Sequence, residues 1–150
     1  MKTTTVLAAL AATASAAHVV NRTFENYLDR QYNISLEGAL LNIGGLGSPL
    51  VVGASPGVVV ASPSRVEPNY FYTWTRDAAL VELMLADEIY FGTEYVGNIS
   101  LQKVLEDYTT AQARLQTVTN PSGALWPAGL GLAEPKFFTN LTRFNSAWGR

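Results

Sequence analysis

The feature that most constrains the fold is an alternation of helical segments with long loops rich in glycine and proline. Residues 77–90 and 100–117 carry apolar side chains at the three- and four-residue spacing of a helix face. Residues 46–68 and 120–150 instead contain repeated Gly and Pro residues, which interrupt regular structure. Long loops in a compact domain are usually functional or disordered, and the apolar and aromatic content of these argues against disorder. The sequence therefore predicts helices joined by long, aromatic-bearing loops.

Two shorter helices are expected upstream, over residues 23–29 and 35–43. Thr23 and Ser35 are suited to cap their first turns, because a hydroxyl oxygen accepts a hydrogen bond from a free backbone N–H. Gly44 then provides a stop for the second helix.

The helix over residues 77–90 is expected to have Thr75 as its N-cap and to end before Gly92. Its apolar and acidic residues are expected on opposite faces. The residues expected to be buried are Leu80, Leu83, Met84 and Ile89, and those expected to face solvent are Glu82, Asp87 and Glu88.

The first residues are typical of a secretory signal peptide. Lys2 supplies a positive start, residues 6–14 an apolar segment, and residues 14–16 small side chains for cleavage. The apolar segment is shorter than the about 20 residues that a membrane-spanning helix needs. We therefore expect residues 1–17 to be a signal peptide and residues 18–150 to be part of the mature protein, with an alanine-rich helix as the alternative.

Acceptor patterns for N-linked glycosylation agree with a secretory route. The pattern Asn-x-Ser/Thr begins at Asn21, Asn33, Asn98 and Asn140. Together with the leader, these patterns predict a secreted, extracellular glycoprotein.

Charge and composition exclude several kinds of site. A net charge of -2 argues against a nucleic-acid partner, which calls for clustered Lys and Arg. The 150 residues contain no Cys and one His, His18, so neither a thiolate metal site nor a His-based triad can form within them. Acidic clusters with calcium-loop spacing are also absent from the sequence. No metal or organic cofactor is therefore expected.

The densest cluster of functional residue types is the string YFYTWTRD at residues 70–77. Hexose rings have apolar faces that stack on Trp and Tyr, and their hydroxyls favour charged hydrogen-bonding groups such as Arg76 and Asp77. Asp77 could instead only complement the helix dipole, and the aromatic rings could only fill a core. Residue types alone leave both interpretations open.

The full string and its surroundings resemble those of the fungal glucoamylases, glycoside hydrolase family 15. The matches run in the same order along nearly the whole mature chain. They lie at residues 41–44, 57–64, 68–77, 108–113, 120–123, 129–137 and 147–150.

The resemblance implies that residues 18–150 are the truncated N-terminal portion of the family's catalytic domain. It implies an all-α fold, part of an (α/α)6 barrel whose long loops form one end of a sugar-binding pocket. It implies that Arg76 and Asp77 hydrogen-bond the terminal glucose and that Tyr70 packs against its ring. It also implies that Trp74 and Trp148 line the pocket around the scissile linkage. The expected substrates are starch and maltooligosaccharides, cut from their non-reducing ends at α-1,4 and more slowly at α-1,6 bonds.

Members of this family invert configuration with two glutamates, a general acid and a general base. The resemblance places both beyond Arg150, so no catalytic residue is expected here and the 150 residues alone should be inactive. Asp77 does not suit the acid, because the neighbouring positive charge of Arg76 favours its ionised form. At full length we expect a monomer that has no membrane association after signal cleavage.

Rival interpretations remain. The chain could belong to a non-catalytic secreted sugar-binding protein or an inactive paralogue, to another (α/α)6 glycosidase with a different linkage preference, or to a structural glycoprotein.

Overall fold

The computed structural model describes residues 3–133 and 135–145, with side chains from residue 22 onward except residue 133. The chain divides into two compact units, residues 1–37 and 38–150. Among the described residues, the helices lack the combination of length and apolar character that would let one of them cross a membrane.

Helix α1 is a single helix over Thr3–Leu40, so the expectation of two short helices is wrong. Thr23 and Ser35 lie inside it, so neither occupies the N-cap position expected of it. The reason is that residues 3–37 contain neither Gly nor Pro to interrupt the helix, and residues 8–17 are rich in alanine, the residue with the strongest helix propensity. Polar side chains inside such a helix bond to the preceding turn, as Asn33 Nδ2 does to the carbonyl of Asp29 at 2.9 Å.

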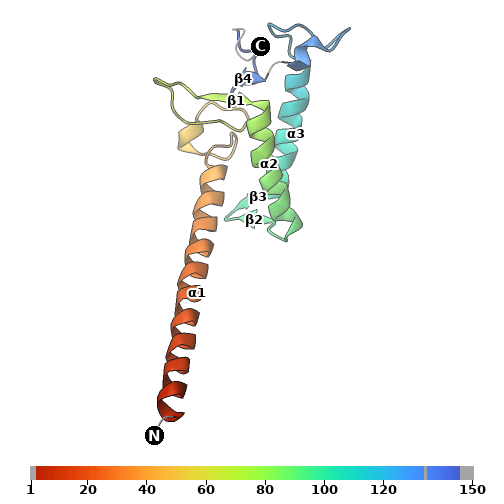
Figure 1. Ribbon diagram of the computed structural model, residues 1–150. Helices are drawn as coiled ribbons and strands as arrows, with labels where there is room; N and C mark the ends of the chain where they lie inside the picture. The colour runs from red at the N-terminus through yellow and green to blue at the C-terminus, as the bar shows by residue number, and fades with distance from the viewer. Residues whose placement is uncertain (1–2, 134, 146–150) are drawn as a thin grey trace. The chain divides into compact units, whose positions relative to one another are not determined.

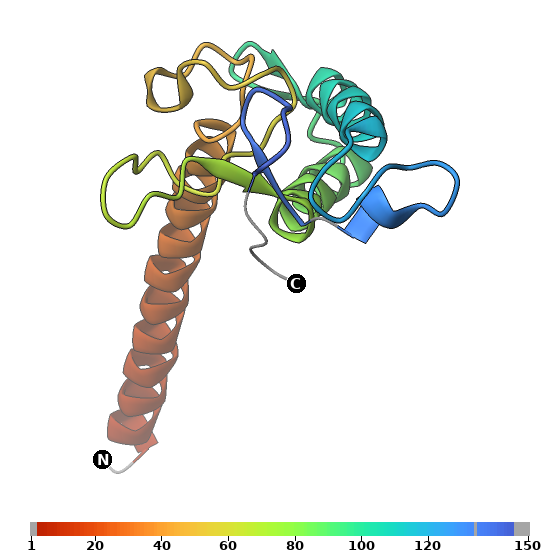
Figure 2. The same ribbon diagram turned by 90° about the horizontal axis from the view of Figure 1, so that it is seen from above.

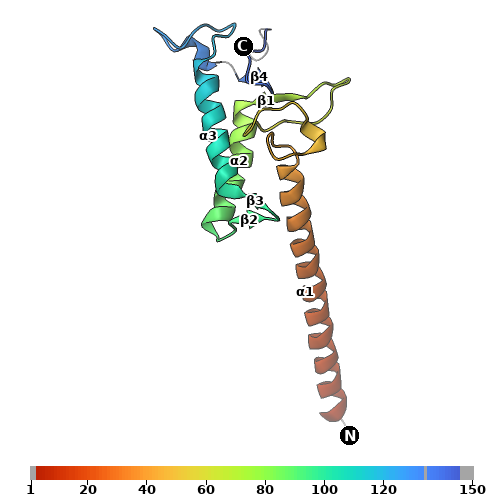
Figure 3. The same cartoon turned by 180° about the vertical axis from the view of Figure 1, so that it is seen from behind.

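The second unit is built around two helices, α2 (Thr75–Tyr90) and α3 (Leu101–Thr117), which pack side by side (Figures 1 and 3). Two short strands, β2 (Tyr95–Val96) and β3 (Ile99–Ser100), join them as an antiparallel hairpin. These two strands lie at the opposite end of the helix pair from the other strands of the unit.

At the other end of the helix pair, strand β1 (Tyr72–Trp74) pairs antiparallel with β4 (Lys136–Phe138). The register sets Thr73 opposite Phe137 and Trp74 opposite Lys136. Figure 2 looks down on this end, where the long loops on either side of the helix pair also lie. The pairing brings the YFYTWTRD string next to a segment about sixty residues later, a contact that sequence patterns did not predict.

Helix α2 buries a different face from the one expected. Ala78, Glu82 and Leu85 are buried, whereas Leu80 is 61% exposed and Leu83 is 58% exposed. Apolar residues occur on both faces of this helix, so periodicity alone could not decide which face turns inward.

The N-cap of α2 also differs from the expectation. Trp74 holds the N-cap position without a side-chain bond that caps the helix, and Thr75 is the first helical residue. The backbone N–H of Thr75 donates instead to the carbonyl of Pro135 at 2.9 Å, so a distant loop satisfies one of the free donors of the first turn. The expected end is confirmed, since the helix stops at Tyr90 and Gly92 adopts a φ of +99°.

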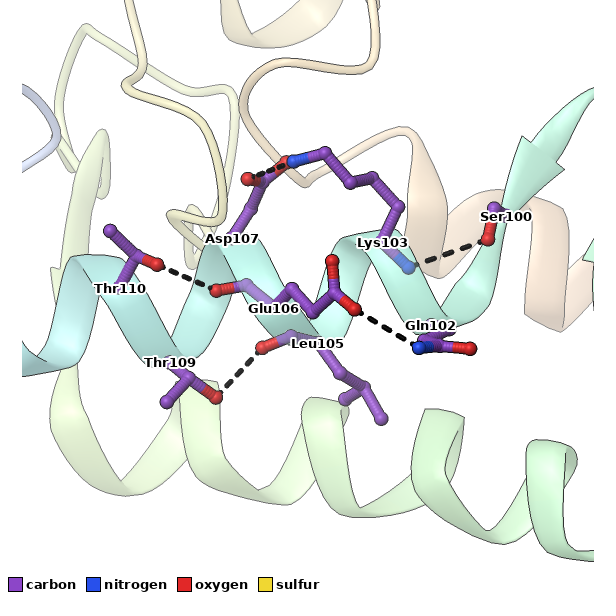
Figure 4. Close-up of polar contacts among 8 residues, drawn as sticks. All are labelled: Ser100, Gln102, Lys103, Leu105, Glu106, Asp107, Thr109 and Thr110. Carbon is purple, nitrogen blue, oxygen red and sulfur yellow. Dashed lines mark hydrogen bonds and ion pairs between the residues drawn. The ribbon is translucent and has the colours of Figure 1, made fainter.

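Helix α3 closely matches the expectation. Figure 4 shows the hydroxyl of Ser100, the N-cap residue, accepting a hydrogen bond from the backbone N–H of Lys103 at 3.4 Å. The side chain of Lys103 also forms an ion pair with Asp107, one helical turn further along α3. Of the apolar residues at helical spacing in residues 100–117, the structure buries Leu101, Val104, Ala111 and Leu115.

The core of the second unit lies where α3 meets β4 and the loop over residues 51–61, which is called the valine-rich loop below. Its buried residues include Val58, Val60, Leu115 and Phe137. Gly57 permits the loop to approach α3, because a Cβ built at this position would lie 2.2 Å from the backbone carbon of Asp107.

Candidate functional site

Strand β1, the loop residue Tyr70 just before it and the first turn of α2 bring three of the expected sugar-binding residues together. Trp74 is the last residue of β1, and Asp77 lies in the first turn of α2. The rings of Tyr70 and Trp74 lie with centroids 6.2 Å apart at an interplanar angle of 53°. A strand that runs directly into a helix thus places an indole and a carboxylate within one helical turn of each other.

Trp74 and Asp77 line the same cavity, of about 190 Å³. Most of its remaining wall is apolar and comes from the valine-rich loop and from α2. The other lining residues are Ala39, Asn42, Val59, Val60, Ala61, Ala78 and Val81. The buried Oδ1 atom of Asn42 has no hydrogen-bond partner among the described residues, so this wall contains an acceptor with spare capacity. An apolar cavity with an indole and a few convergent polar groups is a suitable shape for a small polar ligand with apolar faces.

Arg76 lies beside this cavity but is not part of its lining. Its Nη2 atom is 3.6 Å from Oδ2 of Asp77, and the two side chains are 84% and 51% exposed. An ion pair with this exposure contributes little to folding stability. Both charged groups are therefore accessible to a ligand.

The structure shows where the expected glycosylation acceptors lie, but it does not describe the second expected tryptophan. Trp148 lies outside the described residues. Of the expected glycosylation acceptors, Asn98 and Asn140 are exposed in turns, which suits modification, whereas Asn21 and Asn33 lie within α1. Asn140 Oδ1 also accepts a hydrogen bond from the Thr142 hydroxyl at 2.6 Å.

Lys136 is a residue that the sequence reasoning missed. Its side chain is only 7% exposed, and its Nζ atom lies 3.9 Å from the ring centroid of Tyr72, 5.0 Å from that of Trp74 and 3.9 Å from that of Phe144. Burial lowers the pKa of Lys136 below its ordinary value of 10.5. Only the pairing of β1 with β4 places the ammonium among these rings, so no local pattern signalled it.

Glu82 corrects an expectation, because it is buried rather than solvated. The residue is 3% exposed, and neither carboxyl oxygen has a hydrogen-bond partner among the described residues. Desolvation by this burial raises the pKa of Glu82 from 4.5 to about 7. A raised pKa suits a general acid, but a carboxyl this deeply buried cannot reach the oxygen of a glycosidic bond.

Within residues 3–133 and 135–145, the structure has no group of three or more His, Cys, Asp or Glu side chains arranged to hold a metal ion. The side-chain groups that the described site offers are a carboxylate, a guanidinium and aromatic rings.

The model of the glycosyl hydrolases family 15 matches residues 11–150. Among curated relatives, a glucoamylase of Neurospora crassa is 47% identical over 132 residues, which cover 88% of this chain and 20% of the relative. Glucoamylase P of Amorphotheca resinae is 49% identical over 139 residues, covering 93% of this chain and 22% of the relative.

The chain is also similar to solved structures of glucoamylases. The glucoamylase of Hormoconis resinae matches with a TM-score of 0.74 and 52% identity, over 83% of this chain and 20% of that one. The glucoamylase of Saccharomycopsis fibuligera matches with a TM-score of 0.74 and 38% identity, over 84% and 25%. The likeness confirms the expected fold class, part of an (α/α)6 barrel. The chain spans about a fifth to a quarter of the length of the relatives it matches.

Proposed function

The chain belongs to the glycosyl hydrolases family 15, and on this premise we propose that the protein containing it is a glucoamylase. In this proposal the protein hydrolyses α-1,4 and, more slowly, α-1,6 glucosidic bonds from the non-reducing ends of starch and maltooligosaccharides. It releases glucose with inversion. The glucoamylase names of relatives at 47–49% identity support this substrate class.

The observation that carries the proposal is that Trp74 and Asp77 line one cavity, with the ring of Tyr70 beside the indole. In our proposal the indole stacks on the apolar face of a terminal glucose and the carboxylate accepts hydrogen bonds from its hydroxyls. The exposed guanidinium of Arg76 donates to the same sugar. Trp148 is proposed to add a second tryptophan to the pocket around the scissile linkage.

The chain supplies substrate binding in this proposal, and not the acid and base. An inverting glycosidase needs two carboxyl groups about 6.5–9.5 Å apart. This separation leaves room for the water molecule that attacks the sugar from the face opposite the leaving group. Asp77 is assigned in this proposal to holding the glucose hydroxyls, and Glu82 is buried away from any substrate. We propose that the general acid and base come from the larger part of the relatives' length, which this chain does not span.

We also propose that the protein is secreted as a monomeric glycoprotein after removal of residues 1–17. The leader pattern and the exposed turns at Asn98 and Asn140 support this route. N-terminal sequencing of the secreted protein and its change in mass after enzymatic deglycosylation test both parts.

The function is tested by measuring glucose release from maltose, maltoheptaose and isomaltose with the full-length protein. The proposal expects glucose as the sole product, β-glucose as its first anomer, and faster turnover of α-1,4 bonds. Residues 18–150 alone are expected to release none. Sugar binding by the full-length protein without any hydrolysis would instead favour a non-catalytic sugar-binding protein.

A further inference from the structure

We propose that Lys136 is a positioning residue that holds the indole of Trp74 in place for the sugar. The inference rests on the proposed function, because it concerns the same cavity wall. It adds a residue from β4, far along the chain from the YFYTWTRD string, to the group that determines how well the site binds.

The backbone brings Lys136 to Trp74. The two residues are opposite each other in the antiparallel register of β1 and β4, where side chains of facing residues lie on the same side of the sheet. The Nζ atom of Lys136 is 5.0 Å from the centroid of the Trp74 ring, within the distance at which a cation is attracted to the face of an aromatic ring. The indole that lines the cavity is thus also the indole that contacts the ammonium.

Two further rings fix the position of the ammonium. Lys136 Nζ lies 3.9 Å from the ring centroids of both Tyr72 and Phe144. The rings of Tyr72 and Phe144 meet edge to face, with their centroids 5.3 Å apart. The rings of Tyr72 and Trp74 also meet edge to face, with their centroids 5.9 Å apart. Each ring therefore contacts the cation and at least one other ring, so the indole cannot rotate without disturbing the whole cluster.

Burial explains why the charge matters more here than on the surface. A desolvated ammonium gains more from ring faces than an exposed one does, because water no longer competes for it. A neutral side chain of similar length would fill the same volume but would lose this attraction. The structure thus assigns to the positive charge, rather than to the bulk, the task of orienting Trp74.

The test compares Lys136→Met and Lys136→Arg in the full-length protein. Met keeps the length and loses the charge, whereas Arg keeps the charge and can stack on aromatic rings. Lys103→Met is the matched control, because Lys103 is an exposed lysine whose ion pair lies on α3. For maltose, kcat and KM are measured after normalising each preparation to its fraction of active protein.

We expect Lys136→Met to lower kcat/KM about tenfold, mainly by raising KM, a loss of the size that a buried cation–π contact supports. Lys136→Arg should recover most of that loss, and Lys103→Met should behave as the parent protein. An unchanged KM in the folded Met variant, or a loss in the Arg variant as large as in the Met variant, would overturn the inference.

If Lys136→Met does not fold, Phe144→Leu decides the question, because it removes one ring and leaves the lysine in place. A raised KM for maltose in Phe144→Leu supports the inference, and an unchanged KM overturns it. The proposed function fails separately, by absence of maltose hydrolysis in the parent protein; an active parent whose lysine variants are unchanged would refute only the role of Lys136.

Discussion

Trp74 and Lys136 face each other across the two-stranded sheet of β1 and β4, and the ammonium of Lys136 lies 5.0 Å from the centroid of the indole. This pair joins a segment rich in candidate sugar-binding residues to a strand that follows the long loop after α3. The candidate site is therefore a product of tertiary structure, although most of the side chains proposed to bind substrate come from one short string.

Folding stability should depend on pH through Glu82. Its pKa in the folded protein is about 7 and its ordinary value is 4.5, so the native state holds the proton more tightly than the unfolded state does. Its stabilising contribution is complete below pH 4.5 and is lost as the pH rises through about 7. The loss is about 3 kcal/mol for a shift of this size.

Replacing Glu82 by Gln or Leu should remove this loss. We expect either variant to raise the melting temperature of the full-length protein at pH 8 while changing it little at pH 4.5. The half-buried phenol of Tyr108, whose pKa is raised by partial burial and by the charge of Glu82, should then titrate at a lower pH. Glu94→Gln, at an exposed position, is the control, and equal effects of Glu82→Gln and Glu94→Gln at pH 8 would refute the assignment.

The hydroxyl of Ser100 should stabilise α3, because it accepts a hydrogen bond from a backbone N–H that would otherwise have no helical partner. Ser100→Ala should cost about 1 kcal/mol of unfolding free energy in denaturant titration. Thr75→Ala is the comparison, since Thr75 follows the N-cap of α2 rather than occupying it. A cost at Thr75 as large as that at Ser100 would mean that the caps have been assigned incorrectly.

Gly57 should tolerate no side chain. A Cβ at this position would lie 2.2 Å from backbone atoms of α3, and φ is +73°. Gly53 provides a matched control, because its φ is +89° but no atom lies within 4 Å of an added Cβ. Gly53→Ala should cost about 1 kcal/mol from backbone strain alone, and Gly57→Ala at least about 2 kcal/mol more. Equal melting temperatures for the two variants would show that the loop does not pack against α3 in this way.

Local signals were sufficient for α3 and for the end of α2. The apolar face of α3 and the glycine after α2 both act within a few residues, and the structure has both of them as predicted. The same signals failed for α1, where Thr23 and Ser35 looked like caps. Residues 3–37 contain neither Gly nor Pro, so the helix continues through both of them.

Sequence patterns could not reveal what long-range contacts decide. The buried position of Glu82 depends on which face of α2 turns inward, and both faces carry apolar residues. The aromatic surroundings of Lys136 depend on the pairing of β1 with β4. Tyr70, Trp74 and Asp77 were identified by resemblance, and their shared location follows from the strand running directly into the helix.

The central claim is that the carboxylate of Asp77 holds a terminal glucose in the cavity that it lines with Trp74. The most direct measurement is kcat/KM for maltose in the full-length Asp77→Asn variant, with Asp87→Asn as the control at an exposed position on the same helix. Loss of a charge-assisted hydrogen bond to the sugar predicts a decrease of about tenfold or more for Asp77→Asn and none for Asp87→Asn. A folded Asp77→Asn protein with the kcat/KM of its parent would contradict the account.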